Sequence, residues 1–282
     1  MRDDAVSFRA ACVQMRSGLN RTKNVSECVD FIAQAADEGA QFIVTPEMTN
    51  VVDAKPKRLL ATLPGEDALD EINTFAEAAA RHSVWLLIGS MAVKVDNRRA
   101  ANRSYLFADD GRLVASYDKL HMFDVDLPNG ESWRESNVYQ AGENAVLVKS
   151  PFAQIGCTIC YDVRFPSLYR SLAQAGADVI CVPAAFTRQT GAAHWKTLLR
   201  ARAIETGSFI IAPGQGGEHE DGRETWGHSM IIDPWGEILA ERDNDTPGII
   251  WADIEPSRTV QARARIPNLT LERRYKIAIL PE

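Results

Sequence analysis

The chain has 282 residues, 45% of them hydrophobic, so it is large enough to bury one core without dividing into several domains. Its formal net charge of −7, with acidic and basic residues interspersed, excludes the basic face that nucleic-acid binding requires. No segment reaches the roughly 20 apolar residues of a membrane span and the start lacks the apolar core of a signal peptide, so we expect a single cytoplasmic domain over residues 1–282 with no membrane partner.

The first half of the chain alternates short apolar runs with amphipathic stretches, which is typical of a layered α/β fold. Strands are predicted at Phe8–Gln14, Gln41–Thr45 and Val84–Gly89. Helices are predicted where apolar residues recur on one face, over residues 25–35 and Leu69–His82. The turn signal Asp109-Asp110-Gly111 predicts a β-hairpin between Arg103–Ala108 and Leu113–Asp118, so the fold also needs antiparallel pairing.

The segment from His121 to Glu143 is rich in Asp, Asn, Gly, Pro and Trp and has little periodicity, so we predict a long loop. Such loops inside compact domains are usually functional. Beyond it, helices are predicted over residues 167–176 and 193–206. Strands are predicted at Ala145–Val148, Gln154–Ile159, Asp178–Val182, Phe209–Ala212, His228–Ile232, Glu237–Ala240 and Ile249–Ile254.

Three side chains with chemical potential, Glu47, Lys119 and Cys160, each follow a predicted strand. In a layered α/β fold such positions share a crevice. Amide cleavage without a serine triad needs these groups: a carboxylate takes the thiol proton, the thiolate attacks the carbonyl, and an ammonium stabilises the oxyanion. Taken singly, each is more often structural, because a Cys on an apolar strand is usually core and the other two are usually solvated.

The surroundings of these residues resemble the motifs of the nitrilase, or carbon–nitrogen hydrolase, superfamily. Residues 156–166, GCTICYDVRFP, resemble its nucleophile motif, and Thr45-Pro46-Glu47 and Asp118-Lys119-Leu120-His121 resemble its glutamate and lysine motifs. The order Glu, Lys, Cys also matches. The resemblance continues through residues 190–195, 199–205 and 227–236 and therefore covers nearly the whole chain. These later blocks look most like the branch that contains deaminated-glutathione amidase and ω-amidase.

The resemblance implies an α/β fold in the form of a four-layer αββα sandwich of the nitrilase type. It also implies pairing of such sandwiches, so the expected state is a homodimer or a higher homo-oligomer. In the family Glu47 corresponds to the general base, Lys119 to the oxyanion stabiliser and Cys160 to the residue that forms the acyl-enzyme. The backbone N–H of Tyr161 is implied as a second oxyanion donor, and no metal or cofactor is expected.

Further site residues follow from the same resemblance. A second family glutamate corresponds to Glu135, and Glu131 and Glu143 lie in the same predicted loop. Arg164 is expected to bind a substrate carboxylate bidentately, as the corresponding arginine does in related carbamoyl-amino-acid hydrolases, with an ion pair to Asp162 or a contact at a helix start as the structural alternatives. The predicted walls of the substrate pocket are the aromatic residues Phe123, Trp133, Tyr139 and Phe186.

The function implied is an amidohydrolase that cleaves a small carboxylate-bearing amide to an acid plus ammonia or amine through a cysteine thioester. Hydrolysis of an N-carbamoyl amino acid is the alternative within the family, because pocket shape decides between such substrates. The partner expected is therefore a small-molecule amide.

Readings from other classes have weaker support. Cys157 and Cys160 form a C-x-x-C pair, which raises a thiol–disulfide oxidoreductase, but the five cysteines are scattered and the pair ends an apolar strand. Zinc hydrolysis lacks a compact ligand spacing. The histidines considered for zinc are His121, His194, His219 and His228. A non-catalytic binding protein is disfavoured because all three triad residue types are present.

Overall fold

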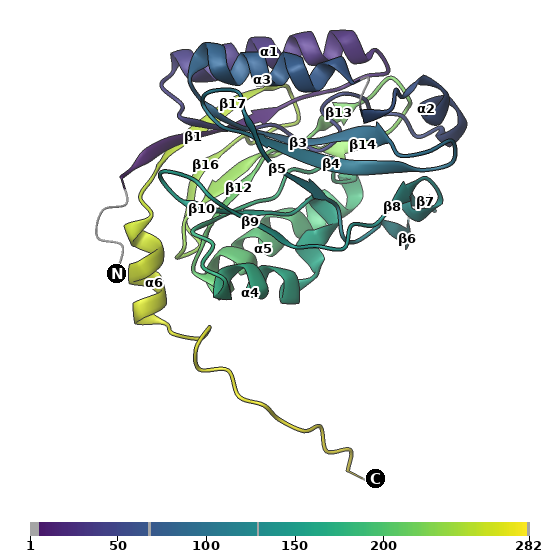
Figure 1. The fold of residues 1–282 in the computed structure, drawn as a ribbon. Helices are drawn as coiled ribbons and strands as arrows, with labels where there is room; N and C mark the ends of the chain where they lie inside the picture. The colour runs from purple at the N-terminus through teal and green to yellow at the C-terminus, as the bar shows by residue number, and fades with distance from the viewer. Residues whose placement is uncertain (1–5, 67–68, 129, 281–282) are drawn as a thin grey trace.

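The computed structural model describes residues 6–66, 69–128 and 130–280. Most strands belong to two sheets that face each other (Figure 1). The seven-stranded sheet has the order β17 (Gly248–Ile254), β1 (Phe8–Gln14), β2 (Phe42–Val44), β3 (Trp85–Lys94), β4 (Ala100–Phe107) and β5 (Leu113–Asp118), with β8 (Tyr139–Gln140) also beside β4. The six-stranded sheet has the order β16 (Ile238–Glu241), β15 (Met230–Ile232), β12 (Phe209–Ala212), β11 (Val179–Cys181), β10 (Gln154–Cys157) and β9 (Val146–Lys149).

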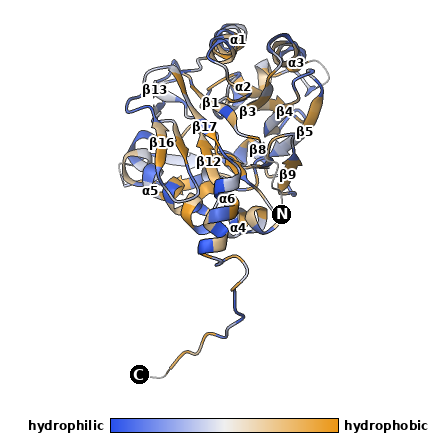
Figure 2. Ribbon diagram, turned by 90° about the vertical axis from the view of Figure 1, so that its left-hand side faces the viewer, coloured by the Kyte–Doolittle hydropathy of each residue, from blue (hydrophilic) through white to orange (hydrophobic). Residues whose placement is uncertain are grey.

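Helices cover the outer face of each sheet. Helices α1 (Arg21–Asp37) and α3 (Asp70–His82) lie over the seven-stranded sheet, and α4 (Pro166–Gln174) and α5 (Arg188–Thr206) lie under the six-stranded sheet (Figure 1). Figure 2 shows largely apolar strands between helices that carry hydrophilic segments. The order helix, sheet, sheet, helix confirms the predicted αββα sandwich.

Strand β1 shows how the sequence places a strand between two apolar layers. Ala10 and Cys12 belong to the core between the sheets, whereas Ala11 and Val13 pack with α1 and α3. All four are fully buried. Because successive side chains point to opposite faces of a strand, burial on both faces requires the continuous apolar run seen in the sequence.

The predicted elements agree closely with the structure in the regular layers. The bounds of β1 and β12 are those predicted, and β4 and β5 form the expected antiparallel hairpin from Arg103↔Asp118 to Phe107↔Leu113. The helix predicted from residue 193 begins five residues earlier, at Arg188. Its first turn was missed because Gly191 lies there and breaks the apolar pattern.

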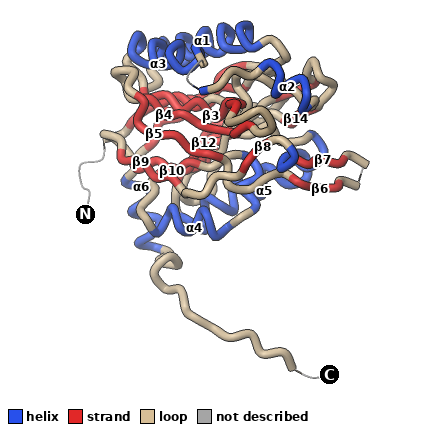
Figure 3. Tube along the Cα trace, turned by 45° about the vertical axis from the view of Figure 1, so that its right-hand side comes forward, coloured by secondary structure: helices blue, strands red, loops and turns tan. Residues whose placement is uncertain are grey.

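The prediction of a structureless loop from His121 to Glu143 was wrong. This segment contains β6 (Asp124–Asp126) paired with β7 (Ser132–Arg134), the 3₁₀ helix η2 (Glu135–Asn137), and β8. The β6–β7 hairpin projects from the side of the sandwich (Figure 3), and its side chains are mostly exposed, in strands of three residues that are too short to give a periodic signal. The other unpredicted elements are α2 (Pro56–Thr62), β13 (Gly216–Glu218), β14 (Glu224–Trp226) and α6 (Ser257–Arg265).

The chain after α6 runs away from the sandwich in extended form (Figure 1). Its apolar side chains at Leu271, Tyr275, Ile277 and Ile279 are exposed.

None of the helices in the described ranges is both long and apolar enough to cross a lipid bilayer. All five cysteines are buried free thiols.

Candidate active site

A cavity of about 480 Å³ brings together Glu47, Lys119, Glu135 and Cys160. This volume lies within the range of small-molecule sites. The wall includes the four aromatic residues predicted for it, which are Phe123, Trp133, Tyr139 and Phe186. Tyr161 also lines the cavity.

Glu47 is positioned by the turn that follows β2. A side chain at Gly89 would meet the Thr45 carbonyl oxygen at 1.9 Å, so this close approach of β3 requires glycine. The Gly89 N–H donates to Thr45 Oγ1 at 3.0 Å, and Met48 N donates to Ser90 Oγ at 3.0 Å. These bonds fix the backbone on both sides of Glu47.

Cys160 follows β10 and begins the 3₁₀ helix η3 (Cys160–Arg164) with φ of +47°. Few non-glycine residues adopt a positive φ, and such strain concentrates at functional sites. The fully buried Asp162 holds the turn, because it accepts hydrogen bonds from Ile159 N at 2.9 Å, the Tyr117 hydroxyl at 2.6 Å and His121 Nδ1 at 2.7 Å.

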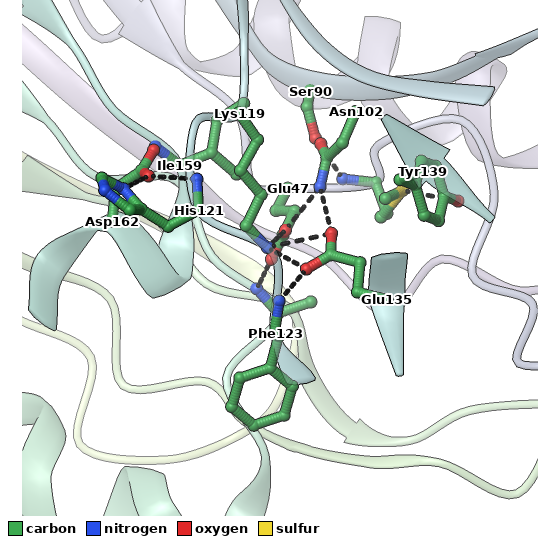
Figure 4. Close-up of polar contacts among 12 residues, drawn as sticks. Glu47, Ser90, Asn102, Lys119, His121, Phe123, Glu135, Tyr139, Ile159 and Asp162 are labelled. Atoms are coloured by element: carbon green, nitrogen blue, oxygen red, sulfur yellow. Dashed lines mark hydrogen bonds and ion pairs between the residues drawn. The ribbon is translucent and has the colours of Figure 1, made fainter. Parts of the chain in front are cut away.

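Lys119 joins two carboxylates in a buried network (Figure 4). Its Nζ donates to Glu47 Oε1 at 2.9 Å and to Glu135 Oε2 at 2.8 Å. Asn102 Nδ2 donates to the same two carboxylates, at 2.8 Å to Glu47 and 3.2 Å to Glu135. The backbone N–H of Phe123 donates to Glu135 at 2.7 Å. The predicted residues therefore meet, and Asn102 is a fourth member that sequence reasoning missed.

The network sets the protonation states of its members. Burial opposes the charge on Glu47, but the Lys119 ammonium and hydrogen bonds outweigh it and hold the pKa of Glu47 below its ordinary value. Burial likewise opposes the charge on Lys119, yet Glu135 and Glu47 raise its pKa well above the usual range. Burial and the Glu47 carboxylate raise the pKa of the Cys160 thiol. The resting site therefore holds a carboxylate, an ammonium and a neutral thiol.

This arrangement can transfer a proton and stabilise an oxyanion. Glu47 Oε2 accepts from Ala185 N at 2.7 Å, and the Glu47 carboxylate is near enough to the Cys160 thiol to raise the pKa of that thiol, so the base lies beside its proton. Tyr161 is the second residue of η3, where the N–H has no partner within the helix. That N–H stays a predicted oxyanion donor, and the charge of the Lys119 ammonium acts on the Cys160 thiol.

Arg164 lies beside the cavity but does not line it. Its Cζ is 5.2 Å from the Phe186 ring centroid and 5.9 Å from that of Tyr161, and Nη2 is 3.2 Å from His194 Nδ1. Among the described residues it forms no ion pair with Asp162. The ion-pair alternative was wrong. The Asp162 carboxylate already accepts hydrogen bonds from the Tyr117 hydroxyl, His121 N and Ile159 N. The carboxylate-binding role of Arg164 stays a prediction.

Of the three glutamates in the predicted loop, Glu135 alone touches Lys119. Glu131 accepts from Trp133 Nε1 at 3.1 Å, and Glu143 is exposed. The signal for Asn102 was a buried amide in an apolar strand whose predicted start, Arg103, lies three residues after the observed start at Ala100 and so left Asn102 out. A second missed residue, Arg223, lines the cavity from the turn between β13 and β14.

The C-x-x-C pair differs from a redox site. Burial raises the pKa of Cys157 to about 12, whereas reactive cysteines have lowered pKa values and partial exposure. For zinc, no group of three or more His, Cys, Asp or Glu side chains in the described part of the chain is arranged to hold a metal ion. His219 is instead held by Ser17 O and Thr225 Oγ1, at 2.8 and 2.7 Å.

Known proteins resemble the chain along nearly its whole length. Residues 9–264 match the family model described as carbon-nitrogen hydrolase. The chain is 40% identical over 267 residues to the deaminated glutathione amidase of Synechocystis sp., covering 93% of this chain and 97% of the relative. It is 37% identical to the probable hydrolase nit2 of Schizosaccharomyces pombe, covering 92% and 96%. The crystal structure of Saccharomyces cerevisiae Nit3, a member of branch 10 of the nitrilase superfamily, matches with a TM-score of 0.84 at 25% identity, covering 95% and 97%.

Proposed function

Because the chain belongs to the carbon–nitrogen hydrolase family and is an amidase, we propose that it cleaves small amides with a free carboxylate, using Glu47, Lys119 and Cys160. The observation that carries the triad assignment is the 2.9 Å contact between Lys119 and Glu47 beside the Cys160 thiol, inside a ligand-sized cavity. Base, nucleophile and oxyanion stabiliser then occupy one pocket.

In the acylation half of this proposal, the Cys160 thiol gives its proton to Glu47 as the sulfur attacks the amide carbonyl. The Lys119 ammonium and the Tyr161 N–H stabilise the oxyanion. As the oxyanion collapses, the C–N bond breaks and the leaving nitrogen takes the proton from Glu47. The products of this half-reaction are ammonia or an amine and a thioester on Cys160.

In the deacylation half, Glu47 accepts a proton from water, and the resulting hydroxide attacks the thioester carbonyl. The C–S bond breaks, the acid leaves, and the thiolate regains its proton from Glu47. Glu135 acts in this scheme by holding the Lys119 ammonium charged and oriented through bonds of 2.8 and 3.1 Å. It is a positioning residue for the lysine.

The substrate class rests on the relatives and the pocket. The Synechocystis relative is named for deaminated glutathione, and we carry over to this chain a short amide with a carboxylate, including the ω-amidase type. The proposed contacts are Arg164 for the acyl-side carboxylate, with Phe123 and Phe186 as walls. An N-carbamoyl amino acid is the second candidate, and its carboxylate lies on the amine side of the scissile bond, so Arg164 would then bind the leaving group.

A matched pair of substrates tests this assignment. Glutaramic acid carries a carboxylate where glutaramide carries a second carboxamide, and the two compounds are otherwise identical. Release of ammonia from each by the purified protein should favour glutaramic acid, by roughly ten- to hundredfold if a charge-assisted bond is made. Equal turnover of the pair would reject the acidic-substrate assignment, and turnover in a Cys160→Ala variant would reject the triad.

We also propose that the protein is a cytoplasmic homodimer or higher homo-oligomer. The exposed apolar side chains of the extended C-terminal segment support association, because isolated apolar tails seldom remain uncovered. The free thiols support a reducing compartment. Light scattering of the full chain and of a variant ending at Arg265 should give an oligomer and a smaller species, respectively. A monomeric full chain would contradict the proposal.

A further inference from the structure

Gln215 is a fully buried amide that contacts the main chain of the proposed base, Glu47. It lies between β12 and β13. Its Nε2 donates to Glu47 O at 3.1 Å and to Met48 O at 3.3 Å. Its Oε1 accepts from Ser17 N at 3.0 Å. The mechanism derived so far gives this amide no part, although both of its ends are bonded to segments beside the site.

The turn that carries Glu47 has a backbone conformation that needs support. Met48, the next residue, has φ of +57°, which non-glycine residues seldom adopt. Glu47 O and Met48 O both accept from Gln215 Nε2. Thr49 O accepts from Ser17 Oγ at 3.0 Å, and that hydroxyl accepts from Gln215 Nε2 at 2.8 Å. Three successive carbonyl groups therefore end on one buried pair of side chains, which opposes relaxation of the turn.

The backbone of Gln215 acts on the other end of Glu47. Gln215 N donates to Ala184 O at 2.8 Å. The N–H of the same peptide group, Ala185 N, donates to Glu47 Oε2 at 2.7 Å. Hydrogen bonds in such a chain polarise one another, so the bond at Ala184 O strengthens Ala185 N as a donor. Gln215 thus holds Glu47 directly at its main chain and, through one peptide group, at its carboxylate.

The chemistry of this position fits the amide of glutamine in one orientation. With the oxygen and nitrogen exchanged, the oxygen would face the carbonyl oxygens of Glu47 and Met48, and the NH₂ group would face the Ser17 N–H. Neither pairing forms a hydrogen bond. A methionine has a similar length but offers neither the donor nor the acceptor, so it removes these bonds while filling the space.

We propose that Gln215 is a positioning residue for Glu47: its amide holds the turn at Met48, and the turn aims the Glu47 carboxylate at the Cys160 thiol. This inference rests on the proposed function, because it takes Glu47 as the base. Proton transfer requires hydrogen-bond distance, and a displacement of about 1 Å can cost roughly a hundredfold in rate. A relaxed turn also loosens the 2.9 Å contact with Lys119 that stabilises the carboxylate charge.

The test measures the pH dependence of glutaramic acid hydrolysis in Gln215→Met. We expect kcat to fall by roughly ten- to hundredfold with KM little changed, because the aim of the base matters in the transition state. The acid limb of kcat/KM should move to higher pH, because the Glu47 carboxylate loses part of its stabilisation. A residue that served the fold alone would lower stability without moving this limb.

Gln14→Met is the matched control. Gln14 is also fully buried, and its amide donates to Asn244 O and Thr246 O, both at 2.8 Å, in the loop between β16 and β17. Its loss should lower the free energy of unfolding while kcat and the acid limb stay as in wild type. Ser17→Ala removes only the hydroxyl bonded to Thr49 O and Gln215, and it should give the Gln215→Met pattern at smaller size.

The outcomes separate this inference from the proposed function. A folded Gln215→Met with the kcat and acid limb of wild type would overturn the inference, and so would equal changes in Gln14→Met. Should Gln215→Met fail to fold, Ser17→Ala decides, and wild-type kcat and acid limb in that variant would overturn the inference. Full turnover in Glu47→Gln rejects Glu47 as the base, whereas an inactive Glu47→Gln beside an unaffected Gln215→Met rejects the positioning role alone.

Discussion

Lys119 Nζ lies 2.9 Å from Glu47 Oε1, and the exposed fractions of the two side chains are only 2% and 5%. Because both side chains are shielded from water, the ion pair is strong, but the loss of either partner leaves a buried charge without compensation. The two side chains proposed for catalysis are therefore also structural. The consequences for stability and for turnover can be separated by measurement.

Lys119→Ala should lower both turnover and stability. We expect kcat to fall by on the order of a hundredfold or more, because the oxyanion loses a charged donor. The free energy of unfolding should fall by roughly 3–5 kcal/mol, because Glu47 and Glu135 lose their common cation. Chemical denaturation and ammonia release measure the two effects. The exposed Lys149→Ala is the matched control, and a fully active Lys119→Ala would contradict the assignment.

The pH dependence follows from the pKa of Glu47. Burial opposes its charge but Lys119 outweighs burial, so its folded pKa lies below the ordinary 4.5. Stability from this group is present above the ordinary value and is lost as the pH falls through the lowered one. Because the base must be ionised, kcat/KM should stay on its plateau down to below pH 4.5. A profile already falling near neutral pH, with the fold intact, would contradict this state of Glu47.

Asn102 should act as a positioning residue for both carboxylates. Its amide donates to Glu47 at 2.8 Å, and Asn102→Ala removes that bond, so the pKa of Glu47 should rise and the acid limb of kcat/KM should move to higher pH. Asn102→Asp should move it further, because a like charge is added. A lower plateau with an unmoved acid limb would assign Asn102 to the fold alone.

Glu135→Gln should keep the fold and cut turnover, because a neutral amide holds the Lys119 ammonium less firmly than a carboxylate does. We expect a fall in kcat of on the order of a hundredfold, the range of general acid–base and oxyanion groups. Glu143→Gln, an exposed change of the same kind nearby, should behave as wild type. The reverse pattern would show that the wrong loop glutamate was assigned.

The sequence could predict the triad because each of its residues follows a regular strand. Strands β2 and β10 are buried apolar runs, whereas β5 is mostly part-exposed and is marked by the hairpin turn that precedes it. The resemblance to the family motifs then implied a role for each of the three residues, which their place at the end of a strand does not. The αββα layers could be predicted for the same reason, since strands buried on both faces and helices with one apolar face leave strong periodic signals.

Asn102 and Arg223 could not be predicted in this way, because tertiary contacts bring them to the site. Arg223 reaches the cavity through Asp221, whose partner Ala54 is 167 residues away in the chain. The β6–β7 hairpin has strands of three residues each, too short to show a period. Local pattern contains no information on such long-range packing.

In the proposed mechanism, the acyl group of the substrate passes through the sulfur of Cys160. The most direct measurement is intact-protein mass spectrometry of rapidly acid-quenched turnover of glutaramic acid, with peptide mapping of the adduct. We expect a mass increase equal to one glutaryl group minus one hydrogen, located at Cys160 and retained in Cys157→Ala. The increase should be absent in Cys160→Ala, which should have no turnover. Turnover in Cys160→Ala, or an adduct located at Cys157, would contradict it.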